Sequence, residues 1–315
     1  MFQQSIALIT LLLSFSLGIY SVLPALNHSY PLALGKELWP YLCLIPVFGF
    51  GFRLSHRSLR RQYLRLGIAT LLAVLMATPW LQWVGMPKLG SHPDGLRVMS
   101  YNIWTQNSDY AAIQQSIQQE NPDILFLTEI NLSVMDEIKN RLDYPYHQHS
   151  KLGSNAIFSR YPLLSVTAEY PNVTDHGLNF SLVAQVQMPQ ELLTVIGIHP
   201  PIPLTRSSFA VRNQQFERIA PFIEKISNRV IVMGDFNTSP WSPYFSQFLQ
   251  AADLSSVTQG QGIWATWSYE STFPHLLAKI PIDHIASRGF DGIEAWVGQA
   301  NGSDHRPIVA VLRPV

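Results

Sequence analysis

Cysteine is almost absent from this chain of 315 residues, in which Cys43 is the single example. A disulfide within the chain is therefore impossible, and neither a cysteine-based zinc site nor a cysteine nucleophile can form after Cys43. Internal repeats and low-complexity tracts are also absent from residues 97–315. This part of the chain is long enough for one compact domain with its own hydrophobic core.

Basic residues are scarce in the same part of the chain. Residues 97–315 carry 14 Lys and Arg against 19 Asp and Glu, a net of −5 with His neutral, although the whole chain sums to zero. Proteins that bind a nucleic-acid duplex tightly usually present a basic surface. The charge therefore favours a small or lipid-borne phosphate ester as substrate, with nucleic acid as the less favoured partner.

Long apolar runs are concentrated in residues 1–90, at 6–26, 38–52 and 66–84. As helices, these runs are about long enough to cross a hydrocarbon core of roughly 30 Å, although the second is slightly short. The sequence thus predicts a membrane region with three transmembrane helices over 1–90. A catalytic domain is expected over 91–315.

The orientation of these helices follows from an arginine-rich segment at 53–65, because short Arg-rich loops stay on the cytoplasmic side. The N-terminus is then inside, residues 27–37 are outside, and the catalytic domain faces the periplasm or exterior of the cell. Two alternatives remain open. The first run could be a cleaved signal peptide, although its start lacks basic residues. The second could be an amphipathic surface helix, which would leave the catalytic domain in the cytoplasm.

Residues 97–315 read as a mixture of β-rich and βαβ units. Apolar spacing predicts helices at 109–120, 133–142 and 207–226, the first ending before Asn121-Pro122. Strands are predicted at 123–129, 154–160, 180–188, 192–198 and 229–233, in addition to one that ends at Asn102.

Polar residues follow several of the apolar runs at the point where each predicted strand ends. A side chain in such a position is held by a rigid scaffold, so these residues are expected to meet in one site. The residues concerned are Asn102, Glu129, His199, Asp235, Asn237, Asp283, Asp304 and His305.

The residue types in this set are those that phosphate-ester chemistry needs. Glu129 and Asp235 offer anionic oxygen ligands, and Mg²⁺ or Mn²⁺ prefers such oxygens together with substrate phosphate. Asp235 with Asn237 could place the attacking water, while a histidine such as His305 could stabilise charge in the transition state. The sequence predicts a magnesium site, with manganese as a possible substitute, that includes Glu129.

Seven motifs occur in an order that resembles the endonuclease/exonuclease/phosphatase superfamily over residues 96–313. The resemblance implies a four-layer α/β sandwich of two packed mixed sheets flanked by helices. It also implies magnesium-dependent cleavage of a phosphoester by in-line attack of water. The motifs are Tyr101-Asn102, Thr128-Glu129, 154–162, His199-Pro200, Gly234-Asp235-Phe236-Asn237, Ile282-Asp283-His284-Ile285 and Ser303-Asp304-His305-Arg306-Pro307.

The same resemblance implies a role for each residue. The metal side would comprise Asn102, Glu129 and Asp304, the last as a ligand or a proton-relay carboxylate. The catalytic side would comprise His199 as a phosphate contact, Asp235 with Asn237 as the nucleophile-positioning pair, and His305 supported by Asp283. The chain departs from the nuclease pattern at Trp104, where some nucleases have an acid, and it lacks inserted basic loops.

Several other residues have two alternative predicted roles. Asn155 is predicted to bind substrate or to stabilise a turn, and Arg206 to bind a phosphate or to be a solvated loop residue. His284 is predicted to point away from Asp283 by strand alternation and to be structural. The tryptophans expected near the rim of the site could stack on ligand or only pack. They are Trp241, Trp264 and Trp267.

The leading function is a membrane-anchored, metal-dependent phosphoesterase that acts on a lipid-linked or small phosphate ester. The alternatives are an extracytoplasmic nuclease and a non-catalytic binding module. No protein partner is inferred. A glycosylation sequon begins at Asn237, inside the expected site, so a bacterial inner membrane is favoured over a glycosylating secretory route.

Overall fold

The computed structural model describes part of each of the two compact units into which the chain divides, residues 1–82 with 241–243 and residues 83–240 with 244–315. In the first unit, one helix is described, α2 (Tyr30–Glu37). The three predicted membrane runs lie outside the described residues, apart from Trp83, and no helix among the described residues is long and apolar enough to span a bilayer. The described residues are 30–37, 83, 85, 94–131, 133, 135–150, 154–167, 181–262, 264–268 and 279–315.

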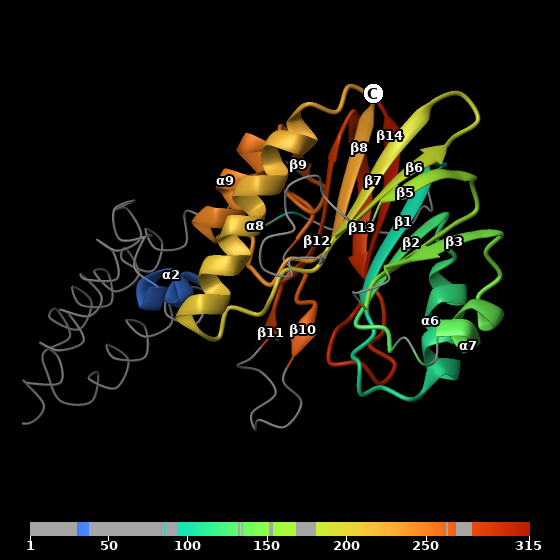
Figure 1. Cartoon of the computed structure of the whole chain (residues 1–315), viewed down its shortest axis with the longest axis horizontal. Helices are drawn as coiled ribbons and strands as arrows, with labels where there is room; N and C mark the ends of the chain where they lie inside the picture. The colour runs from blue at the N-terminus through green and yellow to red at the C-terminus, as the bar shows by residue number, and fades with distance from the viewer. Residues whose placement is uncertain are drawn as a thin grey trace, which may run out of the picture. The chain divides into compact units, whose positions relative to one another are not determined.

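Two six-stranded sheets form the second unit (Figure 1). Each is mixed, because one pair of neighbours is parallel, β1 with β2 and β7 with β8, and the other pairs are antiparallel. The first sheet has the order β13 (Phe290–Val297), β14 (Ile308–Pro314), β1 (Leu96–Asn102), β2 (Ile124–Thr128), β4 (Ala156–Ser159), β3 (Tyr146–His149). The second has the order β5 (Leu163–Thr167), β6 (Ser181–Gln187), β7 (Leu192–Ile198), β8 (Arg229–Asp235), β12 (Asp283–Arg288), β9 (Ser255–Ser256). A separate ribbon pairs β10 (Trp267–Ser268) with β11 (Lys279–Ile280).

The two sheets pack face to face over one apolar core, in which Val98 and Phe126 of the first sheet join Val195 and Ile231 of the second. Both faces of the central strands are apolar, as expected of strands covered on two sides. These strands therefore read as continuous apolar runs in the sequence.

Helices cover the outer face of each sheet (Figure 1). On the first sheet lie α6 (Tyr110–Glu120) and α7 (Met135–Arg141), through residues such as Ile113 and Ile138. On the second lie α8 (Arg206–Glu224) and α9 (Pro243–Ala251), through residues such as Phe216 and Phe248. The predicted four-layer arrangement, with two mixed sheets between helices, is confirmed.

Local signals account for the helix ends. The Asp109 side chain accepts a hydrogen bond from the backbone N–H of Ala112, and Asn121 closes α6 in a left-handed conformation just before Pro122. A reciprocal capping box of Thr205 and Ser208 starts α8. The three helices predicted within residues 97–315 are confirmed to within two residues at each end.

Two predictions about strand ends need correction. Asp283 does not end a strand but begins β12, and His305 precedes β14. Asp283 still reaches the edge where the other site residues lie, because β12 is antiparallel to β8 and pairs Asp283 with Asp235. His305 reaches the same edge because β14 is antiparallel to β1, with Ile308 opposite Ser100. In an antiparallel pair, the start of one strand lies beside the end of its neighbour.

The backbone at position 234, immediately before Asp235, requires glycine. It has φ +151°, and a Cβ atom there would lie 1.8 Å from the carbonyl oxygen of Ile198 on the adjacent strand. We expect Gly234→Ala to lower the free energy of unfolding by about 3 kcal/mol, measured by urea denaturation. Gly260→Ala is the matched control, since Gly260 has φ +74° with no neighbouring atom within 4 Å. Equal losses in the two variants would contradict the steric explanation.

Candidate active site

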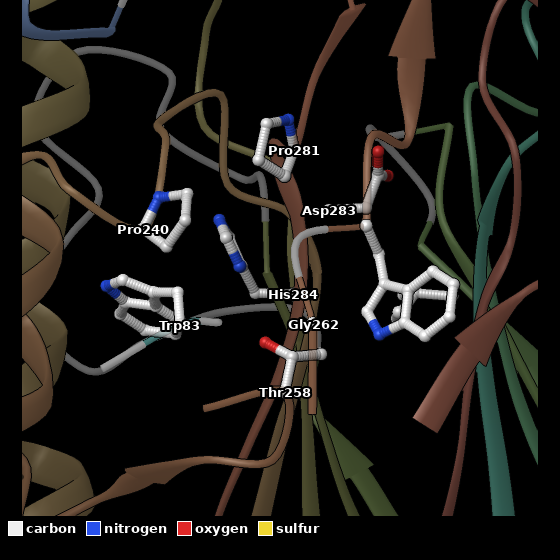
Figure 2. Close-up of a pocket in the computed structure, with 9 residues that line it drawn as sticks. Trp83, Pro240, Thr258, Gly262, Pro281, Asp283 and His284 are labelled. Atoms are coloured by element: carbon white, nitrogen blue, oxygen red, sulfur yellow. The ribbon is translucent and has the colours of Figure 1, made fainter. Parts of the chain in front are cut away.

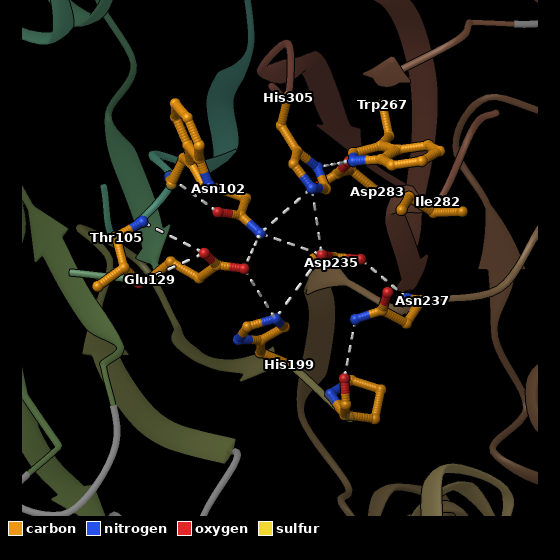
Figure 3. A network of polar contacts seen from close by, with 12 residues as sticks. Asn102, Thr105, Glu129, His199, Asp235, Asn237, Trp267, Ile282, Asp283 and His305 are labelled. Atoms are coloured by element: carbon orange, nitrogen blue, oxygen red, sulfur yellow. Dashed lines mark hydrogen bonds and ion pairs between the residues drawn. The ribbon is translucent and has the colours of Figure 1, made fainter. Parts of the chain in front are cut away.

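Asp235 lies at the centre of a polar cluster between the two sheets (Figure 3). Its Oδ2 atom accepts a hydrogen bond from Asn102 Nδ2 at 3.1 Å. The same oxygen is 3.7 Å from His199 Nε2 and 3.6 Å from His305 Nε2. Its Oδ1 atom accepts from the backbone N–H of Asn237 at 2.9 Å. One carboxylate thus joins the last residue of β1 to residues that follow β7 and β8 and to one that precedes β14.

Glu129 is the second carboxylate of this cluster. Its Oε1 atom accepts from Asn102 Nδ2 at 2.9 Å and is 3.7 Å from His199 Nε2. Its Oε2 atom accepts from the backbone N–H of Thr105 at 3.2 Å. Glu129 and Asn237 both have positive φ, at 58° and 49°. Such conformations are uncommon for residues other than glycine and are often found at functional sites.

The amide of Asn102 is oriented by its backbone surroundings. Its Oδ1 atom accepts from the backbone N–H of Trp104 at 3.0 Å, so Nδ2 faces the carboxylates of Glu129 and Asp235. In this orientation the amide donates to the carboxylate oxygens of Glu129 and Asp235. A direct metal contact through the Asn102 oxygen stays a prediction.

A buried histidine–aspartate pair lies on the other side of Asp235. His305 Nδ1 donates to Asp283 Oδ2 at 2.8 Å, and both side chains are buried. Burial alone would lower the pKa of His305, but the carboxylates of Asp283 and Asp235 outweigh it and raise that pKa to about 10. His305 is therefore a protonated donor at neutral pH, and its Nε2 faces Asp235.

Ser303 connects the end of β1 to the loop that carries His305, and the sequence predicted no role for it beyond its place in a motif. Its hydroxyl donates to the carbonyl oxygen of Asn102 at 2.7 Å and accepts from the backbone N–H of His305 at 3.0 Å. The loop that carries His305 is thereby held against the end of β1.

Asp235 and His199 both have shifted pKa values. Burial, with a contribution from Asp283, raises the pKa of Asp235 to about 7. Burial also lowers the pKa of His199, although Glu129 opposes that shift. His199 is then a neutral imidazole, which still carries one N–H donor.

Arg212, for which no role was predicted from the sequence, holds the turn that carries Asn237. It is fully buried in α8 and its Nη1 donates to the carbonyl oxygen of Asn237 at 2.8 Å. Its guanidinium lies 4.9 Å from the ring centre of Phe209. The position of Arg212 on the apolar face that also carries Phe209 and Phe216 was the available signal, because a charged residue on a buried face needs a polar partner.

The remaining predicted residues are placed as follows. Asp304 is half-buried, burial raises its pKa, and its Oδ2 accepts from Trp267 Nε1 at 3.0 Å. Asn155 is buried just before β4, level with the end of β2. Arg206 is exposed at the start of α8, and among the described residues no hydrogen bond or ion pair joins it to the cluster.

His284 has the structural role predicted for it. Its Nε2 donates to the carbonyl oxygen of Thr238 at 2.8 Å, its ring stacks on Phe245, and burial lowers its pKa to about 4. A small cavity is lined by His284, Asp283 and Trp83, which Figure 2 labels, and also by Trp264. Trp264 packs partly against the core between the sheets.

The donor set fits a divalent metal ion. Glu129, His199 and Asp235 offer ligand atoms that all lie within 4.8 Å of one another, and Asp235, Asp283 and His305 form a second such group. In the part of the chain that the structure describes, Oδ1 of Asp304 is buried without a hydrogen-bond partner. Carboxylate oxygens crowded in this way are stabilised by a cation, and the pKa values of Asp235 and Asp304 are both raised.

A two-sheet α/β sandwich with clustered acids, amides and histidines at one edge defines a class of metal-dependent phosphoester hydrolases. The family model described as Endonuclease/Exonuclease/phosphatase family matches residues 99–305, and the chain belongs to this family.

Known proteins resemble this chain in sequence or in fold, all at low sequence identity. A UPF0294 protein of Vibrio campbellii is 25% identical over 233 residues, covering 68% of this chain and 76% of that protein. The 3′ phosphatase NExo from Neisseria, solved with a product DNA hairpin, has a TM-score of 0.58 and 18% identity, covering 69% of this chain and 99% of that one. Sphingomyelinase C from Streptomyces griseocarneus has a TM-score of 0.54 and 16% identity, covering 70% and 99%.

Proposed function

We propose that this protein hydrolyses a lipid-linked or small phosphate ester, with a divalent metal ion, by in-line attack of water. The observation that carries the proposal is the position of Asp235, whose carboxylate lies within 3.7 Å of polar atoms of Asn102, His199 and His305. Acid, amide and imidazole groups converge there, as phosphoryl transfer requires.

Asp235 is the residue we assign to the attacking water. Its carboxylate is fixed by the backbone N–H of Asn237, and its pKa of about 7 suits a group that accepts a proton near neutral pH. Asn237 is itself held by Pro200, whose carbonyl oxygen accepts from Asn237 Nδ2 at 2.9 Å. Both residues would therefore orient the water with little rearrangement.

His305 and His199 are the donors we assign to the phosphoryl oxygens. The protonated His305, anchored by Asp283, would stabilise negative charge as it develops in the transition state. His199 would donate from the opposite side of Asp235, where its Nε2 lies 3.7 Å from that carboxylate.

The residues that would hold Mg²⁺, or Mn²⁺ in its place, are Glu129 and Asp304, with Asn102 beside them. A bound divalent ion would neutralise charge on the phosphoryl oxygens. Support for this assignment comes from the anionic oxygens of Glu129 within the cluster and from the buried oxygen of Asp304.

We expect Glu129→Gln to weaken Mg²⁺ binding by at least about tenfold, because a neutral amide replaces an anionic ligand. Isothermal titration calorimetry, in which Mg²⁺ is added to the full chain in detergent after EDTA has been removed, would measure the change in affinity. Glu137→Gln is the control, since Glu137 forms an exposed ion pair with Arg141 on α7. Equal magnesium affinity in the wild type and Glu129→Gln would remove Glu129 from the metal site.

Membrane anchoring is part of the proposal. Its support is the set of three apolar runs before residue 90 and the arginine-rich segment between the second and third. These features favour a membrane anchor with the catalytic unit facing the periplasm or exterior, and the glycosylation sequon at Asn237, inside the proposed site, favours a bacterial inner membrane. Anchoring beside a bilayer would raise the effective concentration of a lipid substrate.

The test is hydrolysis by the full chain in detergent with Mg²⁺ or EDTA. The panel would contain bis-p-nitrophenyl phosphate, phospholipids, plasmid DNA and RNA, with Asp235→Ala as the blank. Magnesium-dependent hydrolysis that is lost in the blank supports the phosphoesterase. A preference for DNA or RNA would favour the nuclease, against which the net charge of −5 in residues 97–315 argues. A folded protein with neither hydrolysis nor magnesium binding would favour the non-catalytic module.

A further inference from the structure

Two large aliphatic side chains are exposed on the segment that joins β7 to α8. We call residues 200–206 the 200–206 loop. Ile202 is 49% exposed and Leu204 is 69% exposed. In the part of the chain that the structure describes, only three other large apolar residues are comparably exposed, and they lie apart in the sequence at Tyr146, Leu164 and Val315. Exposed aliphatic residues that cluster beside a site indicate an interaction surface.

The loop is stiff, so these side chains are presented in a defined way. Pro200, Pro201 and Pro203 restrict the backbone dihedral φ at three of its seven positions. Its first residue is held at the active site, because Asn237 Nδ2 donates to the Pro200 carbonyl oxygen at 2.9 Å. Its last residue, Arg206, is the first residue of α8, and the preceding Thr205 caps that helix. A preorganised loop loses little conformational entropy when it binds.

The loop also lies beside the candidate catalytic residues. His199 directly precedes it and lies 3.7 Å from the carboxylate of Asp235 (Figure 3). Ile202 is three residues further along, which places its Cα within about 11 Å of that of His199. Any surface that receives Ile202 therefore lies close to the phosphate position assigned above.

The 200–206 loop also carries a positive charge, because its last residue, Arg206, is exposed. Aliphatic side chains next to an arginine match a lipid surface, where the apolar groups enter the acyl boundary and the guanidinium contacts headgroup phosphates. A soluble phosphate ester would match Arg206 but would leave Ile202 and Leu204 in water.

We propose that the 200–206 loop docks on a lipid bilayer and holds the active site over a phosphoester at headgroup depth. This inference rests on the proposed function and narrows its substrate class to a phosphoester carried by a membrane lipid. Small soluble esters would then be hydrolysed without any contribution from the loop.

A labelling experiment tests the contact without relying on activity. Because Cys43 is the single cysteine, a full-length Cys43→Ser chain can carry one introduced cysteine for an environment-sensitive fluorophore. After reconstitution into phosphatidylcholine/phosphatidylglycerol vesicles, we expect Ile202→Cys to give a blue-shifted signal that nitroxide-labelled lipids quench. Leu164→Cys is the control, since Leu164 is also exposed, at 58%, but lies on β5. Equal quenching at the two positions would overturn the proposal.

An activity comparison separates this proposal from the function on which it rests. Ile202→Asp with Leu204→Asp should lower kcat/KM on vesicle-borne phospholipid by about 100-fold, about tenfold for each aliphatic group kept out of the membrane. Hydrolysis of bis-p-nitrophenyl phosphate should change less than twofold, and Leu164→Asp should affect neither substrate. Equal losses on both substrates, or none on vesicles, would overturn the role of the loop. Absence of hydrolysis in the wild type would instead reject the proposed function, while the labelling result would still decide the contact.

Discussion

Asp235→Asn is expected to lower kcat/KM for a phosphodiester by at least about 10³-fold in Mg²⁺. The amide has nearly the same shape as the carboxylate, but it cannot accept a proton from the attacking water. It also removes the negative charge that lies 3.6 Å from Nε2 of His305. Steady-state kinetics on bis-p-nitrophenyl phosphate would measure the loss.

The stability of this variant distinguishes a catalytic from a structural role. Burial raises the pKa of Asp235 to about 7, which means that folding disfavours its charged form. In the absence of metal, Asp235→Asn should therefore unfold at the same or a higher urea concentration than the wild type at pH 8. Asp291→Asn, on the exposed side of β13, is the control for both measurements. Lower stability together with full activity would contradict the assignment.

His305→Gln is expected to lower kcat by about 10³-fold, with a smaller change in KM, because the lost donor acts on charge that develops in the transition state. Asp283→Asn should lower kcat less, since His305 would remain in place. The double variant should be little worse than His305→Gln alone, because Asp283 acts through His305 across the 2.8 Å hydrogen bond. Additive losses would show that Asp283 has an independent role.

The same pair should contribute to the pH dependence of stability. The pKa of His305 is about 10 in the folded protein, above the ordinary value of about 6.5. A raised pKa contributes stability that is fully present below pH 6.5 and is lost as the pH rises through about 10. Urea unfolding of metal-free protein between pH 6 and pH 10 should show this decrease in the wild type. The decrease should be smaller in His305→Gln, and an unchanged profile would contradict the raised pKa.

Several elements could be predicted because their signals are local. The apolar runs before Asn102, Glu129 and His199 identified three strands and the polar residues that follow them. Asp109 and Asn121 marked the ends of α6, since capping depends on residues within one helical turn. Alternation along one strand was enough to separate the inward Asp283 from the outward His284.

Other features of the site depend on contacts between distant parts of the chain. The antiparallel pairing of β12 with β8 brings Asp283 beside Asp235, and neither strand carries a local signal for that register. Arg212 acts on Asn237 across 25 residues, and Ser303 acts on Asn102 across 201 residues. The Asn102 amide takes its orientation from the backbone of Trp104 only once the turn after β1 has formed.

Residue type and apolar period are local properties, so the residues that could carry the chemistry and the strands and helices around them can be predicted from the sequence alone. How the acids, amides and histidines face one another, which of them are buried, and so which pKa values shift all follow from the tertiary structure. Those properties depend on strand register and on packing between the two sheets. Both arise from interactions that the chain makes only after distant segments have met.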